Sequence, residues 1–155
     1  MTWEYIAGFF DGEGTISSVG DGYRVVISQT NFLVLEEIRL FVGFGNVSQV
    51  AKRKEHWKDA WIYYVARQKQ VLRFLESVEP FLIVKSQKAS RTIVDLQPRV
   101  RRLEVKEKNK EKKIAEVVEL RENGLSLRDI GKKVNLDWSY VGRIVKKHGG
   151  RSSIG

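Results

Sequence analysis

The sequence predicts an α+β domain in residues 1–98, followed by a small all-α module in residues 99–155. Three observations support this fold class. Segments with helical spacing and segments with alternating apolar spacing follow one another through residues 1–98. The composition changes at Gln97-Pro98, and the next residues are mostly charged as far as Lys113. Apolar residues at helical spacing then return in residues 112–147, where no strand pattern is present.

Local signals predict each element of the first domain. Gly20-Asp21-Gly22 predicts a hairpin turn, because glycine adopts positive φ at little cost. Asn31 is a helix-capping residue ahead of apolar positions spaced at three. Pro98 is expected to end the last helix. The expected order is a helix at 3–12, strands at 15–19 and 23–28, a helix from 31 to 41, strands ending at 50 and covering 60–66, and helices at 69–78 and 86–96.

The composition favours a polyanionic partner. The 155 residues carry a formal net charge of +9, and the pI is about 9.8. The absence of cysteine excludes a disulfide scaffold or a cysteine-ligated zinc site. No apolar stretch approaches the roughly 20 residues that span a bilayer, and the N-terminus lacks the basic region of a signal peptide. We therefore expect an intracellular protein of the cytoplasm or nucleoid, without a membrane partner.

The positive charge is concentrated in the second module. Residues 99–155 contain 16 Lys and Arg against 8 Asp and Glu, whereas residues 1–98 contain 12 against 11. Residues 99–110 are expected to form a linker that is partly helical. The two interpretations of this linker are a solvated connection and a segment that contacts phosphates.

Residues 6–14, with the sequence Ile-Ala-Gly-Phe-Phe-Asp-Gly-Glu-Gly, form the most informative segment. Gly8 and Gly12 are four residues apart and therefore share one face of a helix. A face without side chains allows a second helix to approach closely. If the second helix is a copy of the first, two Glu13 carboxylates converge, and converging carboxylates bind hard divalent cations. The alternative is an apolar N-terminal helix that simply stops at Gly12.

The same nine residues resemble the signature of the LAGLIDADG homing endonucleases, with Gly12 at the second alanine and Glu13 at the final aspartate. The resemblance implies an αββαββα core whose two hairpins form a curved antiparallel sheet that lies in the DNA major groove. It also implies two signature helices side by side. Because the chain contains one signature, a homodimer with twofold symmetry follows. The interface would contain Ala7, Gly8, Asp11 and Gly12.

The resemblance also implies an active site. Glu13 from each subunit and the Gly12 carbonyl would bind Mg²⁺ or Mn²⁺ together with phosphate oxygens and water. Residues 80–88 resemble a second stretch of the family, in which Lys85 corresponds to a lysine that neutralises charge or organises water beside the scissile phosphate. Gln29 aligns with a position that orients solvent. The alternative for Lys85 is a surface lysine at the start of a helix, and the alternative for Gln29 is a residue of a turn. Asp11 is expected to be structural, with hydrogen bonds near the helix end at the interface.

Strand alternation indicates which residues of the sheet would face DNA, because successive side chains point to opposite faces. Ile16, Val25 and Ile27 are assigned to the core. A register slip of one residue would reverse every assignment, and residues 61–64 cannot be assigned to a face. The residues expected to face DNA are Thr15, Ser17, Val19, Arg24, Val26, Ser28, Asn46, Ser48, Val50 and Lys52.

Residues 124–145 resemble the helix-turn-helix of resolvases and transposases. Ser126 with Asp129 approximates a capping box, Gly131 is placed where two helices would cross, and Asn135 is placed at the turn, where positive φ is needed. The expected buried positions are Ile130, Val134, Leu136, Val141 and Ile144. The alternative is a two-helix cap on the first domain. The recognition helix would cover 138–147 and present Ser139, Tyr140, Arg143 and Lys146 to DNA.

Together these features predict an intron-encoded, homodimeric, Mg²⁺-dependent endonuclease that cuts both strands of a long, roughly palindromic DNA site. Two other functions are compatible with the same scaffold. One is a non-catalytic transcription regulator that joins a LAGLIDADG domain to a helix-turn-helix, and the other is a maturase that binds its host intron RNA. Regulators of this kind have generally lost the acid at the position of Glu13, whereas this chain retains Glu13 and Lys85.

Overall fold

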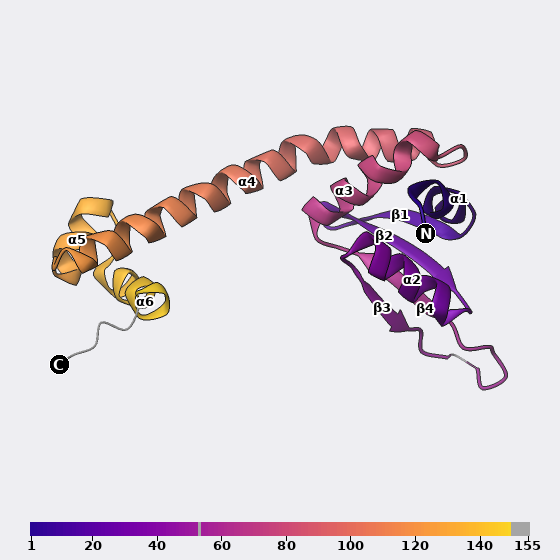
Figure 1. The fold of residues 1–155 in the computed structure, drawn as a ribbon, viewed down its shortest axis with the longest axis horizontal. Coiled ribbons are helices and arrows are strands. Elements are labelled where there is room, and N and C mark those ends of the chain that lie inside the picture. The colour runs from indigo at the N-terminus through magenta and orange to yellow at the C-terminus, as the bar shows by residue number, and fades with distance from the viewer. Residues whose placement is uncertain (53, 150–155) are drawn as a thin grey trace. The chain divides into compact units, whose positions relative to one another are not determined.

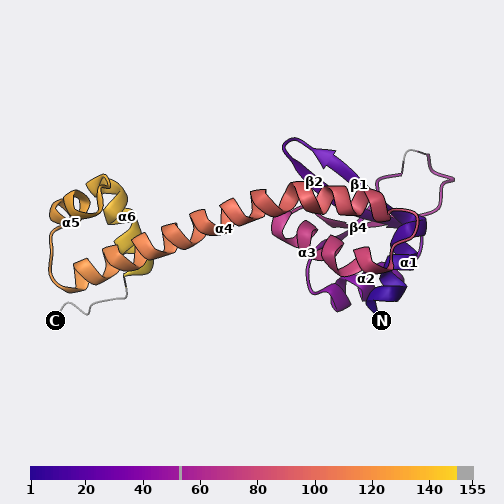
Figure 2. The same cartoon turned by 90° about the horizontal axis from the view of Figure 1, so that it is seen from above.

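The computed structural model describes residues 1–52 and 54–149. The chain forms two compact units, Met1–Arg101 and Arg102–Gly155, which are shown from two directions in Figures 1 and 2. None of the described helices combines the length and the apolar character that a membrane crossing requires.

The first unit is built on a four-stranded antiparallel sheet with the strand order β1-β2-β4-β3. The α+β prediction is therefore confirmed. In chain order the elements are α1 (Trp3–Glu13), β1 (Gly14–Val19), β2 (Gly22–Gln29), α2 (Phe32–Val42), β3 (Asn46–Gln49), β4 (Trp61–Val65), α3 (Gln68–Val78), the short 3₁₀ helix η1 (Glu79–Phe81) and the first part of α4 (Ser86–Glu122).

One face of the sheet packs against the helices of the first unit. The side chains that this face contributes to the core are Ile16, Val25, Ile27, Tyr63 and Val65. They meet fully buried side chains from the four α-helices, including Phe10 of α1, Leu35 of α2, Phe74 of α3 and Leu96 of α4. Ile16, Val25 and Ile27 lie where alternation placed them, so the strand phase of the first hairpin is confirmed.

The local signals fix the ends of the elements. The Asn31 carboxamide oxygen accepts the backbone N–H groups of Leu33 and Val34 at 3.0 and 3.4 Å, and it caps α2 as expected. Gly43 ends α2 with a φ of 79°, in the left-handed region that glycine occupies without a steric penalty. The hairpin turn between β1 and β2 contains Gly20 with a φ of 56°.

The expectation that a helix would end at Pro98 is wrong. Helix α4 continues through Pro98 as far as Glu122, so residues 99–110 are helical throughout. Proline removes the hydrogen bond to the carbonyl four residues earlier. That carbonyl belongs to Val94, which is 70% exposed, and water can therefore replace the missing donor. Leu96 and Val100 are buried on either side of Pro98, and their packing holds the helix across it.

The second unit contains the last part of α4, α5 (Leu127–Val134) and α6 (Trp138–His148). A small core of its own includes Val117, Ile130, Val134, Val141 and Ile144. The Ser126 hydroxyl accepts the backbone N–H of Asp129 at 3.2 Å and caps α5, as expected. Asn135 ends α5 with a φ of 53°, and among the described residues other than glycine it alone has a positive φ.

Candidate active site and nucleic-acid interface

Helix α1 passes directly into β1, and Glu13 lies at this junction. The N-terminus of α1 is capped by Thr2, whose hydroxyl accepts the backbone N–H of Tyr5 at 3.3 Å. At the other end, a Cβ on Gly14 would lie 1.9 Å from a ring carbon of Phe10, so only glycine fits where the helix becomes a strand. Glu13 itself is exposed. The junction therefore presents one carboxylate to solvent from a backbone that has little freedom.

Lys85 lies against this end of α1. Its ammonium group donates a hydrogen bond to the carbonyl oxygen of Asp11. In return the Asp11 carboxylate accepts the backbone N–H groups of Ile83, Val84 and Lys85 at 2.6, 3.1 and 2.9 Å. The structure thus brings Lys85 beside the segment Asp11-Gly12-Glu13. Within the chain Asp11 thus attaches residues 83–85 to α1, and its expected position in an interface between paired helices stays a prediction.

The same contacts set the ionisation of Asp11. Burial by itself would raise the pKa of this carboxyl group. The hydrogen bonds from the backbone N–H groups of Ile83, Lys85 and Val84, with the positive charge of Lys85, outweigh burial and hold the pKa of Asp11 below its ordinary value. Asp11 is therefore a carboxylate at neutral pH.

Gln29 is the last residue of β2 and lies at the same end of the sheet as Glu13. Gly14 pairs with Ile27 across the hairpin, and Gln29 follows Ile27 by two residues. The Gln29 carboxamide oxygen accepts two hydrogen bonds from Thr30, one from its backbone N–H at 2.7 Å and one from its side-chain hydroxyl at 3.2 Å. The solvent-orienting function of Gln29 remains a prediction.

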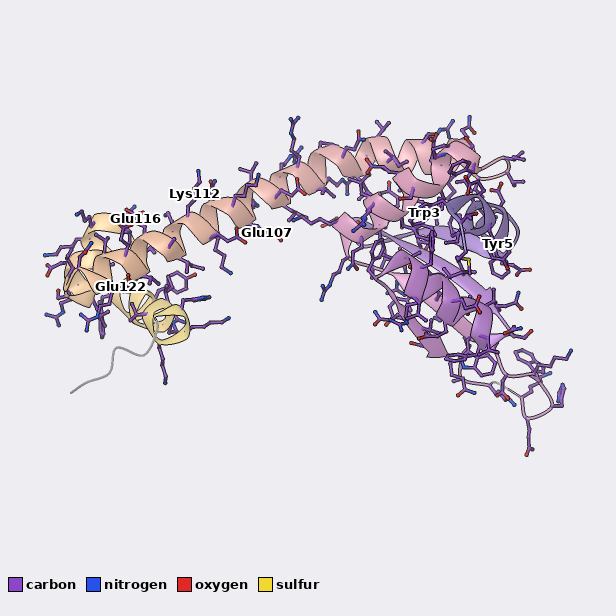
Figure 3. The ribbon with its side chains drawn as sticks, viewed as in Figure 1. Trp3, Tyr5, Glu107, Lys112, Glu116 and Glu122 are labelled. Atoms are coloured by element: carbon purple, nitrogen blue, oxygen red, sulfur yellow. The ribbon has the colours of Figure 1, made fainter. Side chains whose placement is uncertain are left out.

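The glycine face of α1 is open in the single chain. A Cβ added to Gly8 or to Gly12 would meet no heavy atom within 4 Å. The Tyr5 ring stacks on the Phe9 ring at 6.1 Å, and Tyr5 lies on the outer side of α1 with 49% exposure (Figure 3). Ala7, by contrast, is fully buried in the core of its own chain. Because its side chain faces inward, Ala7 has no exposed surface to offer a second α1, and the expectation that it lies in the interface is corrected.

The outer face of the sheet carries the residues expected to face DNA. Residues paired across antiparallel strands share a face. One row across all four strands consists of Thr15, Val26, Tyr64 and Asn46. Ser28, Ile62 and Ser48 form a second row. All of these side chains are exposed or half-buried, and contact of this face with DNA stays a prediction.

The register also assigns a face to each of the four residues, 61–64, that alternation left open. Ile62 and Tyr64 belong to the outer face, whereas Trp61, Tyr63 and Val65 belong to the core face. The Arg24 guanidinium lies over the Tyr64 ring, 5.8 Å from its centroid, at a distance typical of a cation–π contact. Four consecutive apolar or aromatic residues at 61–64 hide any alternation in the sequence, and only the pairing with β2 reveals their faces.

Two further residues expected to face DNA lie beyond the end of β3. Val50 donates its backbone N–H to the carbonyl of Ala60 at 2.8 Å, and it is 41% exposed. The Lys52 ammonium lies 3.0 Å from the carboxylate of Asp59. Val50 and Lys52 therefore belong to the connection between β3 and β4.

The β1–β2 hairpin is held near its turn by α3 and α4. The Gln68 carboxamide accepts the backbone N–H of Tyr23 at 2.8 Å and donates to the Tyr23 carbonyl at 3.0 Å. The Tyr23 hydroxyl donates to the Asp95 carboxylate at 2.8 Å, and this hydrogen bond raises the pKa of Tyr23 above its ordinary value. Arg99 contacts the Asp95 carboxylate at 2.9 Å and the carbonyl of Asp21. These contacts attach the turn end of the hairpin to α3 and α4, and they thereby hold the outer face of the hairpin in position.

In the second unit, the positions expected to be buried pack between the helices. Ile130, Val134, Val141 and Ile144 are buried, and Leu136 packs against them. A Cβ on Gly131 would lie 2.7 Å from the Leu136 carbonyl oxygen, so the close crossing of the turn requires glycine. Four exposed residues of α6 are those expected to contact DNA: Ser139, Tyr140, Arg143 and Lys146. Their binding to DNA remains a prediction.

Comparison with known proteins identifies the family. The family model described as a LAGLIDADG-like domain matches residues 2–79, and the chain belongs to this family. No curated protein matches the chain.

The solved structures that are similar to the chain include two homing endonucleases. One is the archaeal intron-encoded homing endonuclease I-Vdi141I complexed with DNA, at 20% identity and a TM-score of 0.51, with 94% of each chain covered. The other is the homing endonuclease I-CvuI in complex with its target in the presence of calcium, at 20% identity and a TM-score of 0.49, with 94% of this chain and 92% of that chain covered. The similarity to I-Vdi141I shows the LAGLIDADG homing endonuclease fold.

Proposed function

We propose that the chain is a homodimeric, site-specific DNA endonuclease that depends on Mg²⁺ or Mn²⁺. The observation that carries this proposal is the position of Lys85, whose ammonium donates to the Asp11 carbonyl one residue before Gly12 and two before Glu13. A cation thus contacts the last turn of a helix that ends in an exposed carboxylate, Glu13, and whose glycine face is open. This combination is what metal-assisted cleavage of a phosphodiester needs.

The dimer supplies the second half of each site. Gly8 and Gly12 leave room for a second α1 to approach closely. Within the residues that the structure describes, no group of three His, Cys, Asp or Glu side chains is arranged to hold a metal. Paired α1 helices would bring together Glu13 from both subunits, and the shared site is complete only then.

The residues at the α1–β1 junction fit a hard divalent cation. The Glu13 carboxylate and the Gly12 carbonyl are oxygen donors, which Mg²⁺ prefers, and Mg²⁺ commonly keeps phosphate oxygens and waters as its other ligands. A cation bound there would act as a Lewis acid toward the scissile phosphate. Lys85 would stabilise charge that develops on the phosphate, and the Asp11 carbonyl holds its ammonium in place. Gln29 would orient the attacking water.

The outer face of the sheet would contact the major groove of double-stranded DNA. Its polar side chains can exchange hydrogen bonds with base edges, and Val26 and Ile62 can contact thymine methyl groups. A twofold symmetric dimer implies a long, roughly palindromic site. Residues of α6 would contact flanking DNA on each side. The fold is compatible with an enzyme encoded in an intron, with host intron RNA as a further partner, and with an intracellular location.

Replacement of Glu13 by Gln tests the proposal. The wild-type chain is first incubated with a random-sequence duplex library and Mg²⁺, and the new ends are sequenced to find the site. Glu13→Gln keeps the shape of the side chain but removes an anionic ligand from each site. Cleavage should fall by about a hundredfold or more, a loss of the size seen when key electrostatic groups are removed. Binding to the same duplex should persist.

A matched control is Glu37→Gln, which removes one exposed carboxylate from α2. It should cut at the wild-type rate. Full activity of Glu13→Gln would contradict the proposed site. If the wild-type chain binds DNA but does not cleave it, the alternative function, a non-catalytic transcription regulator, is favoured.

A further inference from the structure

A groove in the second unit runs between α4 and α6. It consists of two adjoining cavities with volumes of about 430 and 210 Å³. Ile114 of α4 and Tyr140 and Ile144 of α6 line both cavities and form an apolar floor. None of these three side chains belongs to the first unit, so the groove is a property of Arg102–Gly155 alone.

The walls of the groove are cationic. The α4 wall carries Lys106, Lys110 and Lys113, and the α6 wall carries Arg143 and Lys147. Among the described residues that line the two cavities there is no Asp or Glu. The three lysines follow the i, i+4, i+7 spacing and therefore form one row along a single face of α4. At about 1.5 Å of rise per residue, the row is roughly 10 Å long.

Arg143 is placed by an aromatic ring on its own helix. Its guanidinium lies 5.4 Å from the centroid of the Tyr140 ring, one turn away. A cation–π contact of this kind limits the directions in which the guanidinium points. Because Tyr140 also lines the groove, the charge of Arg143 is held at the groove edge.

We infer that this groove binds the sugar–phosphate backbone of double-stranded DNA. The inference rests on the proposed function as a DNA-binding protein and adds a backbone site beside α6. One DNA strand carries a phosphate about every 3.4 Å along the axis, so a 10 Å row of lysines spans about three phosphates. The apolar floor contacts deoxyribose. Ser139 and Lys146 point elsewhere on α6, so the groove residues position the helix without reading bases.

An acidic amphipathic helix of a partner protein is the competing occupant. Such a helix needs apolar pockets spread over several turns to receive its i, i+3, i+4 and i+7 side chains. Here the apolar lining is limited to Ile114, Leu136, Tyr140 and Ile144. Five Lys and Arg side chains surround these four residues with no Asp or Glu in the described lining, and this concentration of positive charge favours DNA.

Two triple variants of the full chain test the inference. The first, K106Q/K110Q/K113Q, removes the lysine row. The second, R101Q/K108Q/K112Q, removes the same charge from the opposite face of α4, where Lys112 lies away from α6 (Figure 3). All six side chains are exposed, so both variants should fold, with unchanged circular dichroism and thermal unfolding. Affinity for a mixed-sequence duplex of about four helical turns is measured as a function of salt concentration.

Each phosphate contact contributes about 0.9 to the slope of log K against log salt. The groove variant should therefore lose about 2 to 3 units of slope, while the control variant should lose less than about 1 unit. Equal slopes for the two variants, with normal binding by the wild type, would overturn the groove assignment alone. A wild-type chain that fails to bind the duplex at any salt concentration would overturn the proposed function as well. Loss of binding to an acidic amphipathic peptide, with an unchanged DNA slope, would assign the groove to a protein partner instead.

Discussion

Asp11 and Lys85, 74 residues apart in the chain, hold each other through two kinds of hydrogen bond. The Asp11 carboxylate accepts the backbone N–H of Lys85 at 2.9 Å, and the Lys85 ammonium donates to the backbone carbonyl of Asp11. Each residue thus uses its side chain to fix the main chain of the other. The start of α4 is attached by this exchange to the end of α1, where Glu13 emerges.

Asp11→Ala should uncouple Lys85 from the junction. The substitution leaves the N–H groups of Ile83, Val84 and Lys85 without their acceptor, and the loss of hydrogen bonds to a charged group costs about 1.5–3 kcal/mol. We expect cleavage to fall at least about tenfold while DNA binding is retained. Single-turnover cleavage at saturating enzyme measures the effect. Glu37→Ala, which removes an exposed acid from α2, is the control, and equal rates for the two variants would contradict the coupling.

The pH dependence of folding should report the same carboxylate. Because the folded pKa of Asp11 lies below the ordinary value of 3.8, its stabilisation is complete above that pH and is lost as the pH falls through the folded pKa. Asp11→Asn should therefore flatten the acid side of the stability curve. Urea unfolding of the two proteins from neutral pH downward measures this difference, and parallel curves would show that Asp11 does not contribute to acid sensitivity.

Gly8→Leu should prevent dimerisation without unfolding the chain. No heavy atom lies within 4 Å of a Cβ at Gly8, so the single chain tolerates the side chain, whereas a close-packed second helix does not. Sedimentation velocity should show a dimer for the wild type and a monomer for the variant, and cleavage should be lost with the dimer. Glu37→Leu places the same side chain at an exposed position of α2, and this variant should remain dimeric. A monomeric wild type would rule out the shared site.

Gly14→Ala and Gly12→Ala should separate the folding and assembly requirements of the signature. At Gly14 the added Cβ would overlap the Phe10 ring at 1.9 Å, and an overpacked core costs about 1–3 kcal/mol or more. At Gly12 the added Cβ is in open space, so the stability of the monomer should change by less than about 1 kcal/mol. Chemical denaturation of the two variants in the Gly8→Leu background, where no dimer forms, gives the comparison. Equal destabilisation would contradict it.

Tyr64→Ala should broaden base preference near Arg24. The ring supports the guanidinium at 5.8 Å, and without the ring Arg24 samples more directions. Selection of binding sites from a random duplex library should show weaker discrimination at one position of each half-site. Tyr64→Phe keeps the ring and should select the wild-type sequence. If Tyr64→Ala selects the same sequence with the same stringency, Arg24 does not read a base with the help of this ring.

Most helix ends, turns and strand faces of the first unit depend on short-range patterns, and the sequence therefore predicts these features. The Asn31 cap, the Gly20 turn and the alternation of Ile16, Val25 and Ile27 each depend on neighbours within a few residues. The faces of residues 61–64 could not be predicted, because an unbroken apolar run carries no period and only pairing with β2 sets its phase. Helix α4 crosses Pro98 because tertiary packing of Leu96 and Val100 outweighs a local breaking signal.

The candidate site also combines residues that local motifs predict with contacts that only the tertiary structure reveals. Two short motifs predict Gly12, Glu13 and Lys85 as site residues. The contact between the motifs depends on Asp11 and joins residues more than 70 positions apart, which no local pattern encodes. Ala7 was expected in the interface, but it is buried in the core of its own chain. A motif identifies which residues belong to a helix but does not determine which of its faces the core covers, and Ala7 is on the covered face.

The absence of a loop between α1 and β1 separates two properties of the proposed nuclease. In the proposed dimer, pairing of the α1 helices would set the distance between the two sheets, because Glu13 and Gly14 join each helix to its sheet without intervening residues. The number of base pairs between the two half-sites would then be a property of α1, whereas base identity within each half-site would be a property of the outer sheet face. Redesign of the sheet residues should change which sequence is cut and leave the stagger between the two cuts unaltered.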